Sequence, residues 1–226
     1  AEDKTKLSTR FNEILEVLYE SSTWAELDGN EFVTKDHVEK AISEKIYRSN
    51  RIEERMLSMI EKGEILVETE GLAVGQVNGL SVLSTGDYVF GQPSRITARV
   101  HLGNAGVVNI EREAKMSGRI HDKAVMILTG YLGAKYAKDI PLSISASIAF
   151  EQNYGGIEGD SASCAELIAL LSGISGIPVR QDLAITGSMD QLGKVQPVGG
   201  ITYKIEGFYH ACRLKGITGT QGAVIP

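Results

Sequence analysis

The sequence has few of the residues that build disulfide frameworks, zinc sites or membrane spans. Its 226 residues include only two cysteines, too few for a disulfide network or for the paired CxxC motifs of a zinc site. No apolar run approaches the roughly 18 residues that span a bilayer, and no signal peptide opens the chain. The net charge of −6 argues against a dominant nucleic-acid footprint. We therefore expect a soluble, cytoplasmic protein with no membrane segment and no nucleic-acid partner.

Charge divides the chain into two segments. Residues 1–70 hold 17 acidic and 10 basic side chains, whereas residues 71–226 hold 12 and 13 together with most of the glycines. A highly charged, glycine-poor segment is typical of exposed helices, and a lightly charged, glycine-rich one of a compact core. We predict a small all-α segment over 1–70 and an α/β (α+β) domain with mixed sheets and packed helices over 71–226. Because the chain stops directly after a predicted strand, we expect it to be a piece of a larger protein.

Hydrophobic periodicity predicts the elements of both segments. Helices are predicted over 6–25, 35–62, 119–138, 161–171 and 201–214. The second is too long for an ordinary globular helix, so we expect it either to kink near Ser49-Asn50 or to link two bodies. Strands are predicted over 72–83, 96–102, 106–110, 142–150, 182–187 and 223–225. The helix over 161–171 is apolar nearly all round, with Glu166 its one charged residue, which indicates a buried helix.

The start of that helix is the first candidate for chemistry. The run Gly159-Asp160-Ser161-Ala162-Ser163 places a serine hydroxyl near backbone N–H groups that have no acceptor within the helix. Those donors, with the positive end of the helix dipole, can hold an oxyanion. Spacing alone nevertheless favours a simpler interpretation, in which Asp160 or Ser161 only caps the helix.

A nucleophilic serine needs a base. The histidines lie in contexts that do not point to Ser161: His37, His101, His121 and His210. Lys204 is the alternative, because it follows a glycine turn and lies in the first turn of a predicted helix among apolar neighbours. Burial and a helix N-terminus both disfavour its ammonium form. A lone lysine is more often a solvated surface charge, so spacing leaves both interpretations open.

Two other candidate sites, a phosphate-binding loop and a cysteine nucleophile, do not match their motifs. Residues 187–194 approach a phosphate-binding loop, but Gly193 comes one residue late and Val195 replaces the required Ser or Thr. Cys164 lacks an evident base and faces an apolar helix, so we interpret it as a small core residue.

Several motifs, in order, resemble the proteolytic domain of Lon proteases. They are EGDSAS over 158–163, IPVRQD over 177–182, AITGS over 184–188, and QPVGG over 196–200 followed by KIE over 204–206. The GDSAS context is similar to the LonB-like branch and to bacterial Lon homologues, and GLAVGQVNG over 71–79 resembles the start of the same domain. Residues 1–70 resemble the helical subdomain that ends the preceding AAA+ ATPase module.

The resemblance implies a serine endopeptidase that uses a Ser161–Lys204 dyad. Thr186 matches a threonine that hydrogen-bonds within the site. Asp160 and Glu158 match acidic positions beside the serine, where a carboxylate contacts the lysine or blocks the site. For the full-length protein, the resemblance implies a homohexamer that degrades misfolded or regulatory polypeptides with ATP and Mg. Those ligands belong to the missing ATPase module, and we expect neither a cofactor nor a metal in this chain.

A second function remains open. The glycine-rich loop over 152–160 carries acidic residues beside the serine and could close the site. The chain would then be an assembly or interaction module with an occluded, inactive dyad.

Overall fold

The computed structural model describes residues 9–86, 88–137 and 143–226. The chain forms two compact units, Ala1–Glu54 and Arg55–Pro226. The charge pattern places its boundary later, at residue 70, because the exposed charges continue into a stretch that already packs with the second unit. Ile60 and Val67, in that stretch, are buried in a core of the second unit.

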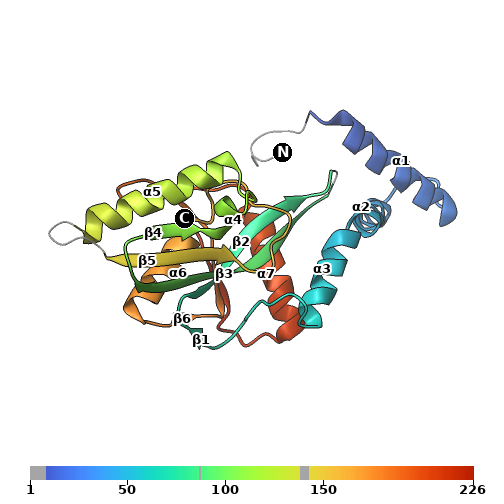
Figure 1. Ribbon diagram of the computed structural model, residues 1–226. Coiled ribbons are helices and arrows are strands. Elements are labelled where there is room, and N and C mark those ends of the chain that lie inside the picture. The colour runs from blue at the N-terminus through green and yellow to red at the C-terminus, as the bar shows by residue number, and fades with distance from the viewer. Residues whose placement is uncertain (1–8, 87, 138–142) are drawn as a thin grey trace. The chain divides into compact units, whose positions relative to one another are not determined.

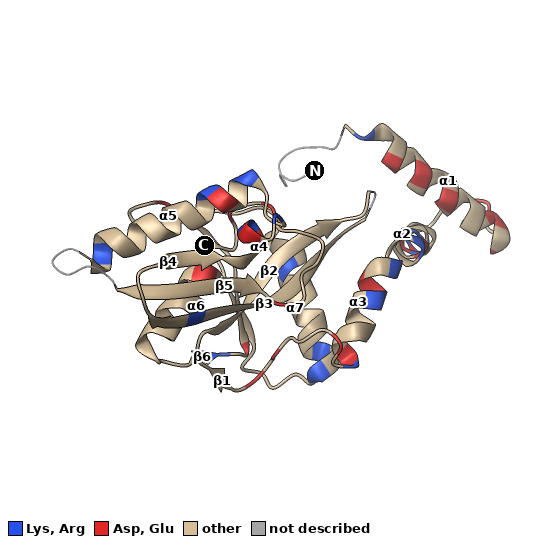
Figure 2. Ribbon diagram, in the orientation of Figure 1, with Lys and Arg blue, Asp and Glu red and all other residues tan. Residues whose placement is uncertain are grey.

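The first unit contains α1 (Phe11–Leu27) and α2 (Lys35–Ser49). Two ion pairs join them, Lys45 to Glu16 at 2.8 Å and Arg48 to Glu20 at 2.7 Å. The long helix predicted over 35–62 is interrupted at Asn50, where α2 ends and α3 (Arg51–Glu61) begins, so the predicted kink is confirmed. Charged residues are frequent on α1 to α3, as Figure 2 shows. The first residues of the helix predicted over 6–25 lie outside the described part.

The second unit is built on a mixed six-stranded sheet with the strand order β10-β7-β2-β3-β5-β4. Figure 1 labels β2, β3, β4 and β5 of this sheet. β2 and β5 pair with β3 in antiparallel register, whereas the β10–β7, β7–β2 and β4–β5 pairs are parallel. The strands are β2 (Gln76–Ser84), β3 (Val89–Leu102), β4 (Gly106–Asn109), β5 (Ile144–Phe150), β7 (Leu183–Ile185) and β10 (Gly222–Val224). Two small antiparallel pairs accompany the sheet: β1 (Leu72–Ala73) with β6 (Val179–Arg180), and β8 (Ser188–Met189) with β9 (Val195–Gln196).

Helices cover both faces of this sheet. The helices are α4 (Ile110–Glu113), α5 (Arg119–Tyr136), α6 (Ser163–Ser175) and α7 (Ile201–Lys215). Ile185 belongs to the core that contains Leu170 of α6, whereas its neighbour Ala184 belongs to the core that contains Phe208 of α7. Successive strand residues point to opposite faces, so α6 and α7 pack on opposite sides of the sheet.

The observed elements confirm a mixed α/β domain and correct several boundaries. The strand predicted over 72–83 is divided into β1 and β2, and β3 begins seven residues before its predicted start at Ile96. The last residue of the strand predicted over 106–110 is instead the first of α4. Residue 138 of one predicted helix and residue 142 of one predicted strand lie outside the described residues.

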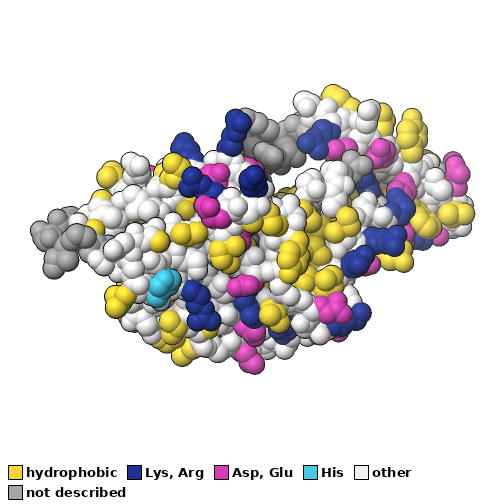
Figure 3. Space-filling view, in the orientation of Figure 1, with side chains coloured by type: hydrophobic (Ala, Val, Ile, Leu, Met, Phe, Trp, Pro, Cys, Tyr) yellow, Lys and Arg dark blue, Asp and Glu magenta, His cyan; other side chains and the backbone are white. Residues whose placement is uncertain are grey.

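The surface mixes residue types. On the face shown in Figure 3, acidic, basic and hydrophobic side chains are interspersed. None of the described helices combines the length and apolarity required to cross a bilayer.

Candidate active site

Ser161 lies where a glycine-rich loop turns into α6, as its sequence context predicts. The helix begins at Ser163, and Gly159 has a φ of +91°, a left-handed conformation that glycine adopts without strain and that turns the chain just before the serine. The hydroxyl and the N–H of Ser163 both donate to the carbonyl of Asp160, at 2.6 and 3.1 Å. The residue at the N-cap of α6 is Ala162, and no side chain forms a capping hydrogen bond there, so neither Asp160 nor Ser161 has the capping role that spacing alone favours. The Ser161 side chain is half-buried.

The backbone of Ser161 is hydrogen-bonded to the segment that follows β7. Its carbonyl oxygen accepts hydrogen bonds from the N–H of Gly187 at 2.8 Å and from the hydroxyl of Thr186 at 3.1 Å. The N–H of Cys164 donates back to the carbonyl of Gly187 at 3.0 Å. These bonds fix the serine against residues 186–187.

Lys204 reaches the same segment from the opposite face of the sheet. It lies in the first turn of α7, and only 3% of its surface is exposed. Its Nζ donates to Thr186 Oγ1 at 3.0 Å, and this hydroxyl in turn donates to the carbonyl of Ser161. The structure thus brings Ser161, Thr186 and Lys204 together. Within the described part of the chain, no hydrogen bond joins the Ser161 hydroxyl directly to Lys204 Nζ.

A close approach between α7 and β3 sets the position of the lysine. A Cβ on Gly91 of β3 would overlap the carbonyl oxygen of Tyr203 and lie 3.0 Å from the Cα of Lys204. A Cβ on Gly207 would in turn overlap the backbone of Gly91. Because neither residue has a side chain, the backbones of the helix and the strand touch, and Lys204 enters the interior beside Thr186.

Burial changes the acidity of this lysine. Desolvation lowers the pKa of Lys204, and the nearby carboxylate of Asp160 partly opposes that effect. When the pKa of a buried amine is lowered, a larger fraction of it is neutral at a given pH, and only the neutral amine accepts a proton.

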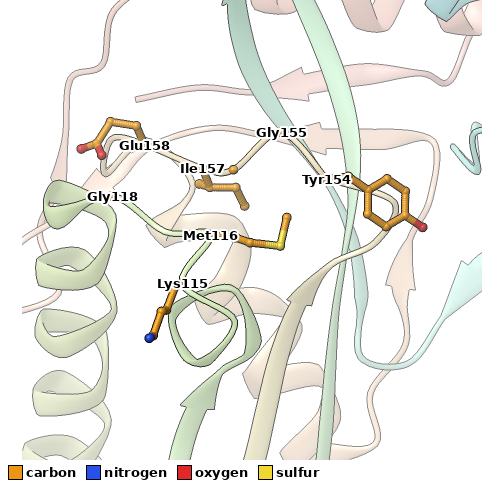
Figure 4. Close-up of a pocket in the computed structure, with 8 residues that line it drawn as sticks. Lys115, Met116, Gly118, Tyr154, Gly155, Ile157 and Glu158 are labelled. Carbon is orange, nitrogen blue, oxygen red and sulfur yellow. The ribbon is translucent and has the colours of Figure 1, made fainter.

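The two acidic residues beside the serine have different positions. The carboxylate of Asp160 accepts a hydrogen bond at 2.8 Å from the hydroxyl of Ser188, a residue that the sequence analysis did not single out. The carboxylate of Glu158 instead accepts from the N–H of Ile120 at 3.2 Å, in the first turn of α5. Figure 4 shows Glu158 directed toward Gly118 at the start of that helix. Among the ion pairs of the described residues, none joins Glu158 to Lys204.

The loop over 152–159 separates two cavities. One, of about 430 Å³, is drawn in Figure 4 and is lined by residues 115–116, Gly118 and residues 154–158. The other, of about 450 Å³, is lined by Ser161, by residues 79–83 of β2 and by the same loop. Only the second contains the candidate nucleophile, and we call it the serine groove.

One wall of the serine groove is a partly unpaired strand. β2 pairs with β3 over its whole length, but it pairs with β7 only at Asn78 and Gly79. Among the described residues, the second edge of Leu80–Ser84 has no strand partner. A free strand edge beside a nucleophile can bind an extended polypeptide by main-chain hydrogen bonds.

The rival sites of the sequence analysis do not assemble. Residues 188–196 form the β8–β9 pair, and no helix opens at its turn, so they do not make a phosphate-binding loop. The Cys164 thiol contacts the carbonyl of Ser188 at 3.6 Å, and burial raises its pKa, which disfavours the thiolate. No group of three metal-ligating side chains forms among the residues that the structure describes.

Residues 151–162, between β5 and α6, carry Ser161, and we call them the serine loop. Two buried ionisable residues near this loop were not identified as functional from the sequence. His121 and Glu166 are both fully buried, with His121 Nε2 lying 3.5 Å from Glu166 Oε1. A single charged residue in an otherwise apolar helix was the available signal for Glu166. Nothing in the sequence pairs it with a histidine on another helix.

Comparison with known families gives two matches. Residues 32–217 match the family described as Lon protease (S16) C-terminal proteolytic domain, and residues 1–48 match the archaeal LonB AAA+ ATPase LID domain.

Individual relatives agree with these families. The chain is 43% identical over 201 residues to a "Putative Lon protease homolog" of Escherichia coli, covering 88% of this chain and 34% of the relative. It is 33% identical over 210 residues to an "Archaeal Lon protease" of Archaeoglobus fulgidus, covering 90% of this chain and 32% of the relative. The chain thus spans about a third of the length of these relatives.

Proposed function

Because the chain belongs to the Lon protease family through its C-terminal proteolytic domain, we propose that it is a serine endopeptidase in which Ser161 is the nucleophile and Lys204 the general base. The observation that carries the proposal is the chain of contacts from Lys204 Nζ through the Thr186 hydroxyl to the Ser161 carbonyl. It places a buried amine with a lowered pKa next to the segment that bears the serine. General bases work best when their pKa lies near the working pH.

The reaction follows from these positions. Neutral Lys204 accepts the proton of the Ser161 hydroxyl while Oγ attacks a peptide carbonyl. Lys204 then gives that proton to the leaving amine, and water hydrolyses the acyl-enzyme. The N–H groups of Ser163 and Cys164 are already bonded to the carbonyls of Asp160 and Gly187. The N–H groups of Ser161 and Ala162 are thus the donors that we assign to the oxyanion.

The substrate is an extended polypeptide. The edge of Leu80–Ser84, which has no strand partner in the part of the chain that the structure describes, and the 450 Å³ serine groove fit a chain that adds to β2 as a further strand. Main-chain pairing gives affinity for many sequences, which suits a protease acting on unfolded or misfolded proteins.

ATP dependence and a hexameric ring belong to the proposal for the whole protein. The match of residues 1–48 to a LID domain supports an attached ATPase module. On its own, this chain should cut peptides and unfolded proteins without nucleotide, and adding ATP should leave the rate unchanged. If ATP increased the rate of cleavage by this chain alone, the proposal that ATP acts through a separate ATPase module would be wrong.

The dyad is tested by substitution. Ser161→Ala and Lys204→Gln should each lower the cleavage of a fluorogenic peptide by at least about 10³-fold, with the fold retained by circular dichroism. Ser175→Ala, at the other end of α6, is the matched control and should keep full activity. Near wild-type turnover by Lys204→Gln would exclude lysine as the base.

One observation favours an alternative, an assembly module with an inactive dyad. Lys204 Nζ bonds to Thr186, and no hydrogen bond to the Ser161 hydroxyl is present among the described residues. A fluorophosphonate separates the two functions, because it labels only a serine that a base activates. Labelling at Ser161 supports the protease, whereas a folded chain that stays unlabelled supports the assembly module.

A further inference from the structure

Behind the serine loop lies a group of four buried polar side chains that the proposed mechanism does not use. Its members come from four elements: Asn109 at the end of β4, Glu111 in α4, His121 in α5 and Glu166 in α6. Their exposed fractions are 3%, 5%, 0% and 0%, respectively. We call this group the buried polar cluster.

The cluster holds the start of the serine loop. Phe150 is the last residue of β5, and its N–H donates to Glu111 Oε1 at 2.7 Å. The ring of Phe150 also packs edge-on against the His121 imidazole, with ring centroids 5.5 Å apart. The chain therefore leaves the sheet from a fixed point.

The cluster also holds the end of the same loop. Glu166 lies in the first turn of α6, and its N–H bonds to the carbonyl of Ala162, the residue after the serine. The Glu166 carboxyl meets His121 Nε2 at 3.5 Å, while the Asn109 amide lies 3.2 Å from the same nitrogen. Next to His121 on α5, the N–H of Ile120 bonds to Glu158. One histidine thus connects both ends of the loop to α5.

Stability alone does not explain these residues. Both Glu166 oxygens, Glu111 Oε2 and His121 Nδ1 are buried without a standard hydrogen bond among the described residues. Burial, together with Glu111, raises the pKa of Glu166 to about 8. Burial lowers the pKa of His121, against the effects of Glu111, the Gly159 backbone and two further carboxylates. Well-packed apolar residues in such places are often as stable as, or more stable than, a buried polar pair.

We propose that His121 and Glu166 are positioning residues, whose contact fixes the loop and the first turn of α6 so that the Ser161 hydroxyl faces the lysine. The inference rests on the proposed function, because the reaction it serves is the Ser161–Lys204 reaction. The pair touches no substrate. It acts through the backbone that bears the nucleophile, where displacement by about 1 Å can cost about 100-fold in rate.

Glu166→Leu tests the inference by removing the polar contact while filling the space. We expect kcat on a fluorogenic peptide to fall about 10- to 100-fold, with KM changed less than about twofold. Glu166→Gln, which resembles the protonated carboxyl, should restore most of the rate. His121→Phe keeps the ring packing against Phe150 and should repeat the loss of kcat if Glu166→Leu does not fold. Ser172→Ala, a buried polar substitution at the far end of α6, is the control and should leave kcat unchanged.

Hydrogen exchange read by mass spectrometry separates this inference from the proposed function. Glu166→Leu should increase exchange in residues 152–163, whereas Ser172→Ala should not. If the wild-type chain is never labelled by a fluorophosphonate but this increase is found, the proposed function fails, and what is left of the inference is that the pair orders the loop without serving a reaction. If Glu166→Leu and His121→Phe keep the wild-type kcat and the wild-type exchange, the inference is wrong.

Discussion

Asp160 is the side chain of the site that opposes the low pKa of Lys204. In Asp160→Asn the carboxylate is lost, so the pKa of Lys204 falls further and the neutral amine appears at lower pH. The rising limb of kcat against pH should therefore move to lower pH. The ratio of the rate at pH 7 to that at pH 9 should increase by about 2–3-fold.

Ser188→Ala is the matched control for this change. It breaks the hydrogen bond that Ser188 makes to Asp160 but leaves the carboxylate charge in place, and the pH profile should stay where it is. A shift of equal size in Ser188→Ala would show that geometry, and not charge, sets the profile.

Thr186 links the amine to the serine segment, and only a hydroxyl both accepts from Lys204 Nζ and donates to the Ser161 carbonyl. Thr186→Val removes both bonds at nearly constant shape. We expect kcat to fall about 100-fold with little change in KM, and the unfolding free energy to fall by about 1–3 kcal/mol because a buried amine loses its acceptor. Thr186→Ser should recover most of the rate. Steady-state kinetics and urea unfolding measure both effects, and unchanged kcat in Thr186→Val would show that this contact is not needed.

Some residues of the site could be identified from the sequence, and others could not. A serine at a glycine-rich helix start and a lysine in an apolar first turn are local patterns that make Ser161 and Lys204 candidates, but it is the resemblance to Lon proteases that implies a dyad. Their approach, through Thr186 and from opposite faces of a sheet, depends on strand order, which periodicity does not give. The pairing of Glu166 with His121 was missed for the same reason, since the two residues lie on different helices and meet only when α5 and α6 pack.

Between elements, the contact of α7 with β3 positions the lysine. In Gly91→Ala the new methyl group would overlap the Tyr203 carbonyl, and α7 would have to move away from the strand. We expect a loss of about 1–3 kcal/mol in unfolding free energy and of about 100-fold in kcat, measured by urea unfolding and peptide cleavage. Gly133→Ala is the control. It lies in α5 with open space around it, and it should stabilise the chain by about 0.5–1 kcal/mol without changing kcat. Wild-type activity in Gly91→Ala would contradict this account.

Secondary structure shows the same division between local and non-local signals. The break at Asn50 between α2 and α3 was predicted because a periodic run over 35–62 is too long for an ordinary helix. The early start of β3 at Val89 was not predicted, because Gly91 and Pro93 are residues that rarely occur inside strands. Pairing with β2 and the close approach of α7 override that local preference.

For the molecule as a whole, Glu166 couples the stability of the second unit to pH. The pKa of Glu166 is about 8 in the folded chain, against an ordinary value of 4.5. Between these values the folded state binds a proton that the unfolded state has lost, so stability falls as pH rises. His121 has the opposite sign, because its pKa is lowered from 6.5 and the unfolded state binds the extra proton below that pH. Above pH 6.5 the histidine no longer contributes, and the effect of Glu166 remains.

Raising the pH from 6.5 to 8 should therefore lower the unfolding free energy of the wild-type chain by about 1–2 kcal/mol. Glu166→Gln has no titrating carboxyl and should lose this slope. Urea unfolding followed by far-ultraviolet circular dichroism at several pH values measures it. Fluorescence of Trp24, the single tryptophan, follows the first unit separately because Trp24 lies in α1. An equal slope in wild type and Glu166→Gln would mean that Glu166 is already ionised below pH 6.5.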